Sequence, residues 1–77
     1  MDEQYKDEFI QLGLKIAYYR KRKGYTQEQL AEMIDRSAAF IGHVEAPKVK
    51  KSVSLKTLFA ISKALEEPVY KFLKFDD

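Results

Sequence analysis

The sequence predicts an all-α protein, a compact bundle of about five short helices in one domain over residues 1–77. Two observations predict this class. Apolar residues recur at spacings of three and four along most of the chain, the period of helices with one buried face. Capping residues, glycine and proline stand at the joints between these stretches, and no stretch alternates as a strand would. A chain of 77 residues buries only a small core.

The first expected helix covers residues 5–23. Its inward face carries apolar side chains one turn apart, namely Phe9, Leu12, Ile16 and Tyr19. Gly24 suits the left-handed residue that ends a helix.

Two shorter helices follow. Thr26 and Gln29 have the spacing of a capping box, so the second helix begins here and ends near Asp35. Ser37 is the next N-cap, and the third helix must end before Pro47, because the residue before a proline resists the helical conformation. Two helices joined so tightly cross at a steep angle, and the second can enter a major groove of DNA.

The C-terminal part predicts two more helices. Ser54 caps the fourth, whose inward residues are Leu55, Leu58, Ile61 and Leu65. Pro68 begins a short fifth helix that contains Val69, Phe72 and Leu73.

Charge is unevenly distributed along the chain. Residues 1–14 hold one lysine against four acidic residues, net −3, and the acids lie in the N-terminal segment 1–8. Residues 15–51 hold nine basic residues against four acidic ones, net +5. A basic middle is what a phosphate-binding surface needs, and the alternative is a solvated charged surface.

Composition argues against several other classes of protein. Cysteine is absent and His43 is the single histidine, so we expect no disulfide, no structural metal and no cofactor. A hard cation held weakly by carboxylates alone stays open. No nucleophile and base can be assembled from these residues, so we expect no enzyme and no small-molecule ligand. No apolar run approaches the ~20 residues of a membrane span and the N-terminus is acidic, so we expect no membrane contact and a cytoplasmic location.

Three stretches of the chain resemble the phage repressor and Cro-like (XRE) family of helix-turn-helix domains, over about residues 12–73. They are KIAYYRKRKGYTQEQLAEMI, SAAFIGHVE and SLKTLFAISKALEEPVYKFL. The resemblance implies a lambda-repressor-like fold whose second and third helices form the helix-turn-helix. It also implies a homodimeric transcriptional regulator that binds double-stranded DNA, with a recognition helix at about residues 37–45 in the major groove.

The resemblance also implies roles for individual residues. Positions that face bases or phosphates from the recognition helix are Ser37, Ala38, Ala39 and His43. Positions that meet DNA phosphates are Lys15, Gln27, Lys48, Lys50 and Lys51. Arg36 is expected to reach the DNA backbone or a groove edge. Arg20 and Glu45 match a structural salt bridge between the first helix and the end of the third.

The recognition helix departs from the family pattern, because its outward residues are two alanines, Gly42 and His43 rather than Arg, Gln or Asn. Because few of these side chains can distinguish DNA bases, a second hypothesis stays open: a protein-interaction module on the same fold, such as an antitoxin-like partner. Phe40 is expected to be partly buried; contact with thymine methyls or with a partner protein are the alternatives.

The C-terminal end carries more apolar area than a small monomer easily hides, which indicates a dimer interface. The candidates are Val69, Tyr70, Phe72 and Phe75. The alternative is that Phe72 and Leu73 close the monomer core. We expect both to be partly true, with Tyr70 and Phe75 as the stronger interface residues.

Overall fold

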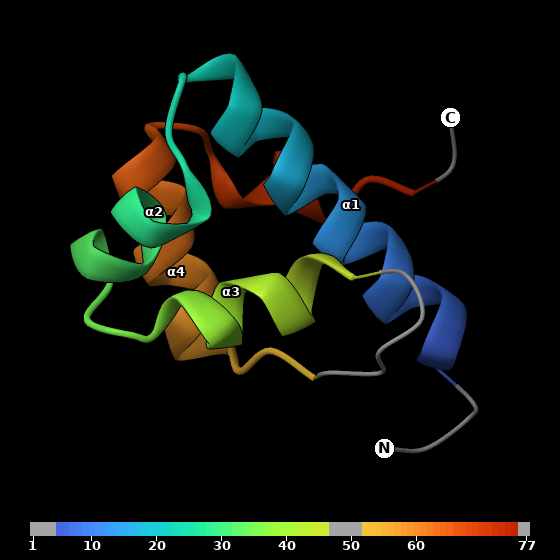
Figure 1. The fold of residues 1–77 in the computed structure, drawn as a ribbon. Helices are drawn as coiled ribbons and strands as arrows, with labels where there is room; N and C mark the ends of the chain where they lie inside the picture. The colour runs from blue at the N-terminus through green and yellow to red at the C-terminus, as the bar shows by residue number, and fades with distance from the viewer. Residues whose placement is uncertain (1–4, 47–51, 76–77) are drawn as a thin grey trace.

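The computed structural model describes residues 5–46 and 52–75, and these form four α-helices and one 3-10 helix (Figure 1). In chain order they are α1 (Lys6–Arg22), α2 (Gln27–Met33), α3 (Ala38–Glu45), α4 (Leu55–Leu65) and the 3-10 helix η2 (Val69–Phe72). The all-α class is confirmed. There are four α-helices rather than five, because the segment after Pro68 is a 3-10 helix of four residues. Within the described ranges, no helix is both long and apolar enough to span a bilayer.

Local hydrogen bonds set the helix ends at the expected joints. Thr26 and Gln29 form both bonds of the capping box, at 3.0 and 2.8 Å. The hydroxyl oxygens of Ser37 and Ser54 each accept a bond of 3.1 Å from the backbone amide three residues on. Gly24, with φ +80°, reverses the chain after α1. Each cap satisfies an amide that would otherwise lack a partner in the first helical turn.

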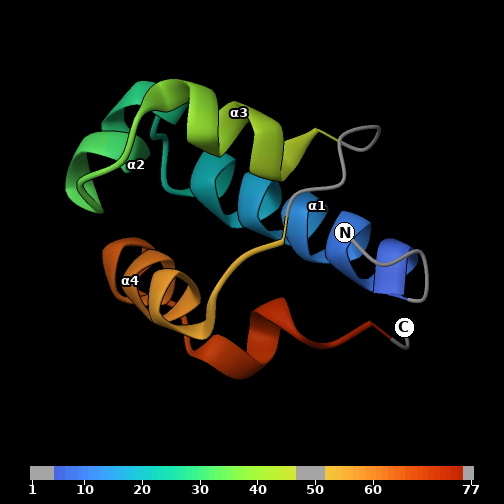
Figure 2. The same ribbon diagram turned by 90° about the horizontal axis from the view of Figure 1, so that it is seen from below.

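α1 lies in the middle of the molecule, with α3 on one side and α4 and η2 on the other (Figure 2). The buried core comprises Leu12, Ile16, Leu30, Ala31, Ile41, Val44, Leu58, Ile61, Leu65 and Phe72. The Phe72 ring is fully buried and meets Tyr19 edge to face, with 5.3 Å between ring centroids. η2 therefore holds α1 and α4 together from the C-terminal side.

One predicted core residue lies outside. Leu55 is 60% exposed, so the expectation that it faces inward is wrong. It is the first residue of α4 and lies about 80° around the helix from the buried stripe of Leu58, Ile61 and Leu65. Leu73 is also exposed and does not close the core.

α1 and α3 touch backbone to backbone at Gly13. A Cβ atom built on Gly13 would lie 3.1 Å from the carbonyl carbon of Val44, and closer still to its oxygen. A side chain of any size would separate the two helices. Gly13 therefore determines how closely α3 lies on α1.

Candidate nucleic-acid interface

α3 presents one face to the core and one to solvent. Ile41 and Val44 are buried, at 0% and 4% exposure. Of the four predicted base-contact residues, Ala39 and His43 are exposed on the opposite face of α3. Ser37 is exposed at the N-cap, and Ala38 is half-buried at the side of the first turn. The structure thus places Ala39 and His43 on one accessible helix face, with Ser37 and Ala38 at its N-terminal end. Three of them offer at most a hydroxyl or a methyl group, and His43 offers ring nitrogens.

The angle of α3 is held by a buried ion pair at its C-terminal end. Arg20 of α1 donates from Nε to Oε2 of Glu45 at 2.7 Å and from Nη2 to Oε1 at 3.0 Å. The side chains are 9% and 5% exposed. Arg20 also donates from Nη1 to the backbone oxygen of Tyr25, at 2.7 Å. The predicted pair is therefore formed with the bidentate geometry that suits a guanidinium and a carboxylate.

Gln27 completes this network from α2. Its Nε2 donates to Glu45 Oε1 at 3.0 Å, so one carboxylate holds groups from both α1 and α2. Within the described residues, no buried side-chain nitrogen or oxygen lacks a hydrogen-bond partner. A buried carboxylate that accepts three hydrogen bonds fixes the relative orientation of the three helices. Losing Arg20 would leave the buried charge uncompensated, and losing Gln27 would remove one of its hydrogen bonds.

The side chain of Gln27 lies beside the half-buried Gly42 of α3. A Cβ built on Gly42 would be 3.6 Å from Gln27 Oε1, an ordinary contact. Only one of the two amide N–H groups of Gln27 is needed for Glu45. The second remains available beside the predicted base-contact face.

Arg36 and Phe40 make a contact between helices. The guanidinium carbon of Arg36 lies 4.9 Å from the centre of the Phe40 ring, and its Nη2 donates to Thr57 Oγ1 at 3.2 Å. Phe40 is half-buried and packs against the core, which confirms the expectation of partial burial. Arg36 therefore connects Phe40 of α3 to Thr57 of α4, and Arg36 itself remains exposed to solvent.

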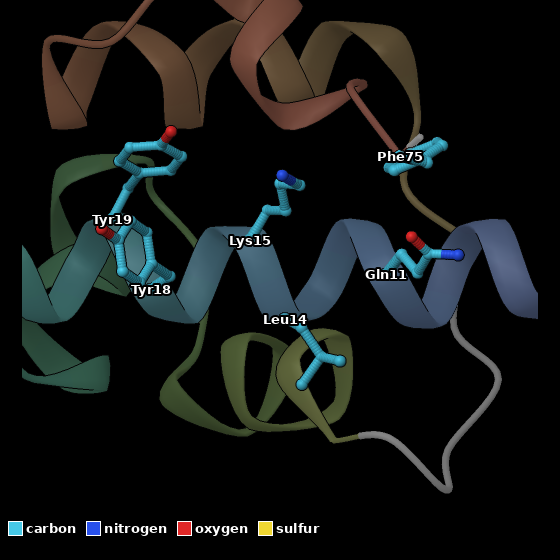
Figure 3. Close-up of a pocket in the computed structure, with 6 residues that line it drawn as sticks. All are labelled: Gln11, Leu14, Lys15, Tyr18, Tyr19 and Phe75. Atoms are coloured by element: carbon cyan, nitrogen blue, oxygen red, sulfur yellow. The ribbon is translucent and has the colours of Figure 1, made fainter. Parts of the chain in front are cut away.

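Of the other predicted phosphate contacts, Lys15 lies in the described part of the chain and is not gathered with these residues. Lys15 points toward the C-terminal segment, away from α3, where it lines a hollow with Tyr19 and Phe75 (Figure 3). Three further candidates lie outside the described residues, namely Lys48, Lys50 and Lys51.

The predicted dimer residues divide into two groups. Phe72 has no exposed surface, so its assignment to an interface is wrong: the ring fills the monomer core. Tyr70 is 66% exposed, and Val69 and Phe75 are half-buried. Tyr70, Leu73 and Phe75 line a second shallow hollow together with Lys74.

One ion pair near η2 has shifted pKa values. Lys71 Nζ donates to Glu67 Oε1 at 3.0 Å. This hydrogen bond and the lysine's charge lower the pKa of Glu67, and the same hydrogen bond raises the pKa of Lys71. The pair stabilises the turn into η2 and lies outside the predicted DNA face. In the described part of the chain, no three His, Asp or Glu side chains are grouped to hold a metal ion.

A helix-turn-helix family model matches residues 16–72 of this chain. The protein belongs to the XRE-type helix-turn-helix family. A curated relative of this XRE-type protein is the control protein C.SmaI of Serratia marcescens. It is 37% identical over 62 residues, which cover 80% of this chain and 71% of the relative. The family resemblance read from the sequence is thus confirmed.

Three solved structures of regulatory proteins have a fold similar to that of this chain. The restriction-modification controller protein C.AhdI from Aeromonas hydrophila superposes with a TM-score of 0.80 at 24% identity, covering 88% of this chain and 96% of its own. The biofilm master regulator SinR, in complex with DNA, superposes with a TM-score of 0.75 at 28% identity, covering 82% of this chain and 98% of its own. The hypothetical transcription factor NHTF from Neisseria superposes with a TM-score of 0.79 at 26% identity, covering 96% of this chain and 80% of its own. The XRE-type chain therefore has the fold of transcription regulators and is related to controller proteins.

Sequence reasoning missed two contributors to this arrangement. Gly13 was hidden because a glycine inside an amphipathic helix has no side chain to place on either face. The backbone oxygen of Tyr25 was hidden because an acceptor on the main chain leaves no mark in the sequence. A glycine next to the core residue Leu12 in the first helix is the one sequence signal that could have indicated a close helix contact.

Proposed function

We propose that the protein is a sequence-specific DNA-binding regulator of transcription that acts as a homodimer. α3 enters the major groove with Ser37, Ala38, Ala39 and His43 toward the bases. The observation that carries this proposal is the Glu45 network, which fixes α3 against α1 and α2 while leaving its outer face accessible. The names of the relatives, a control protein and a regulator in complex with DNA, support the same role.

Gln27 is proposed as a phosphate contact. Its amide, held by Glu45 at 3.0 Å, keeps a second N–H for a phosphate oxygen beside the recognition helix. A held donor loses less conformational freedom on binding than a free one. Arg36, and Lys48, Lys50 and Lys51, are proposed to add backbone contacts. Lys15 is the weaker candidate, because its side chain lies on the other side of α1.

The proposed dimer uses the C-terminal surface formed by Val69, Tyr70 and Phe75. Leu73 belongs to this surface because it is exposed, whereas Phe72 does not because it is buried. A two-fold contact uses the same patch twice, so a few exposed apolar side chains are enough. Two recognition helices would then meet half-sites ~34 Å apart.

The test is selection of bound sequences from a random duplex pool at fixed salt. A palindromic consensus is the expected result, and affinity should fall steeply as salt rises, since each neutralised phosphate releases counterions. Gln27→Ala should weaken all selected sequences alike, whereas His43→Ala should relax preference at one base step per half-site. No binding to any duplex at low salt would refute the proposal.

The protein-interaction alternative has one observation in its favour. The exposed face of α3 carries alanines and Gly42, which cannot make the bidentate hydrogen bonds that distinguish guanine and adenine. Recovery of A·T-rich duplexes without a consensus would instead indicate binding led by DNA shape. Absence of duplex binding, together with a stable complex with another protein, would favour the interaction module.

A further inference from the structure

The solvent-exposed face of α1 carries large apolar side chains at regular spacing, although they do not pack against the core. Exposed residues recur along this helix at alternating spacings of four and three, namely Asp7, Gln11, Leu14, Tyr18 and Lys21. This α1 seam lies directly opposite the buried face formed by Leu12 and Ile16. A surface helix ordinarily keeps this face polar, yet its centre carries Leu14 at 48% and Tyr18 at 54% exposure.

We propose that the α1 seam binds the α1 seam of a second copy of this chain, antiparallel across a two-fold axis at Leu14. Alternation of four and three is the spacing with which two helices keep one face in continuous contact. The contact is centred on α1 rather than on the proposed C-terminal dimer surface, with which it shares Phe75 at the edge of the hollow beside α1. It does not depend on DNA binding. A protein with both contacts can join dimers to one another.

Charge complementarity selects a second copy as the occupant. The first turn of α1 carries Asp7 and Glu8, and its last turn carries Lys21 and Arg22. Asp7 and Lys21 are each seven residues from Leu14, so in the antiparallel arrangement Asp7 of one copy lies opposite Lys21 of the other. Two-fold symmetry forms this ion pair twice. A parallel arrangement would place like charges together at both ends, and antiparallel helices also oppose their dipoles favourably.

A hollow beside the seam fits the side chain that must enter it. It has a volume of about 490 Å³ and is lined by Gln11, Leu14, Lys15, Tyr18, Tyr19 and Phe75. Gln11 lies on the seam near Phe75, while Tyr18 lies at the far end (Figure 3). In the antiparallel register Tyr18 of the second copy comes opposite position 10, next to Gln11. Its ring would then occupy the part of the hollow below Phe75.

The contact is small. Five seam residues from each copy cover less than the roughly 1,200 Å² that stable interfaces bury. The pair is therefore weak in dilute solution and gains occupancy when copies are held close together. A covalent trap is the measurement suited to such a contact.

Because the chain contains no cysteine, a single introduced thiol reports one position. With helix axes 8–10 Å apart, the Leu14 Cα atoms facing each other across the axis are roughly 5 Å apart, which a disulfide spans. Leu14→Cys in the full chain, without DNA and under mild oxidation, should form disulfide-linked pairs at least roughly tenfold faster than a control. Glu8→Cys is the matched control, because Glu8 is also exposed on α1 but lies about 120° around the helix from Leu14.

Charge variants test the antiparallel register. In the Leu14→Cys background, Asp7→Lys or Lys21→Asp alone should slow linkage roughly tenfold, since each change makes both ion pairs repulsive. The double variant should restore the original rate. Linkage no faster than in Glu8→Cys would overturn the seam, and single reversals without effect, or a double reversal without rescue, would overturn the register. Concentration-dependent NMR shifts of α1 amides in the unmodified chain give a second readout, and their absence at millimolar concentration counts against the contact.

Discussion

Gly13 and Gly42 form a natural pair for testing how α3 is held. Both are helical glycines, so changing either to alanine gains about 1 kcal/mol of helix propensity. Their surroundings differ. The new methyl on Gly13 would meet the Val44 carbonyl and lie 3.4 Å from Glu45 Cα, whereas the methyl on Gly42 meets only the end of Gln27 at 3.6 Å.

The expected effects therefore have opposite signs. Overpacking a tight site typically lowers the free energy of unfolding by about 1–3 kcal/mol. For Gly13→Ala we expect a cost of about 3 kcal/mol, because the neighbouring Val44 and Glu45 atoms belong to the backbone and cannot change rotamer. Subtracting the propensity gain leaves a loss of roughly 2 kcal/mol for Gly13→Ala. In a domain of this size the midpoint of thermal unfolding should fall by roughly 10 °C, while Gly42→Ala should raise it by about 4–8 °C.

The assay is thermal unfolding followed by circular dichroism, with urea titrations to obtain the free energy of unfolding. Gly13→Ala should also weaken DNA binding, because α3 must move away from α1 to accommodate the methyl group. If Gly13→Ala were as stable as Gly42→Ala, the close backbone contact between α1 and α3 would be wrong.

Three further predictions concern the buried Arg20–Glu45 pair, a strained turn and the half-buried Glu67–Lys71 pair. Arg20→Met should cost about 3–5 kcal/mol in urea unfolding, because it leaves Glu45 buried without its main partner, and adding Glu45→Met should recover much of the loss. Asp35 has φ +60° between α2 and α3, so Asp35→Val should cost roughly 1–2 kcal/mol while Asp35→Gly should leave stability nearly unchanged; equal effects of the two would contradict the strain. The lowered pKa of Glu67 contributes stability that is present above its ordinary pKa of 4.5 and is lost as the pH falls through the lowered value, so unfolding of Glu67→Gln should depend less on pH in that acid range.

Much of the fold could be predicted because its signals are local. Thr26, Ser37 and Ser54 each mark a helix start by a hydrogen bond to an amide three residues away, which spacing alone reveals. The buried face of α1 follows from its apolar period. The prediction was wrong where position along a helix decides burial. Leu55 is as apolar as a core residue, but it lies in the first turn of α4, at the edge of the buried stripe of Leu58, Ile61 and Leu65.

The site was harder to predict because it depends on contacts distant in the sequence. The family pattern pointed to Arg20 and Glu45, 25 residues apart, but not to Gln27 as a third group on the same carboxylate. For Phe72 and Tyr70 composition alone could not decide, because both are aromatic and two residues apart. The turn of η2 directs Phe72 into the core and leaves Tyr70 in solvent.

Glu45 links these features into one account of how α3 can tolerate so weak a base-reading face. Its carboxylate is held by Arg20 and Gln27, and its neighbour Val44 contacts Gly13, so these contacts orient α3 without using the side chains of Ala39 or His43. Residues on the outer side, such as Ala39 and His43, are exposed and no inner contact depends on them. Substitutions there should alter which DNA is bound with little change in stability, whereas substitutions in the Glu45 network should weaken folding and binding together. Measuring unfolding free energy and DNA affinity for both groups of variants separates these outcomes, and a large stability loss on changing Ala39 or His43 would contradict the division.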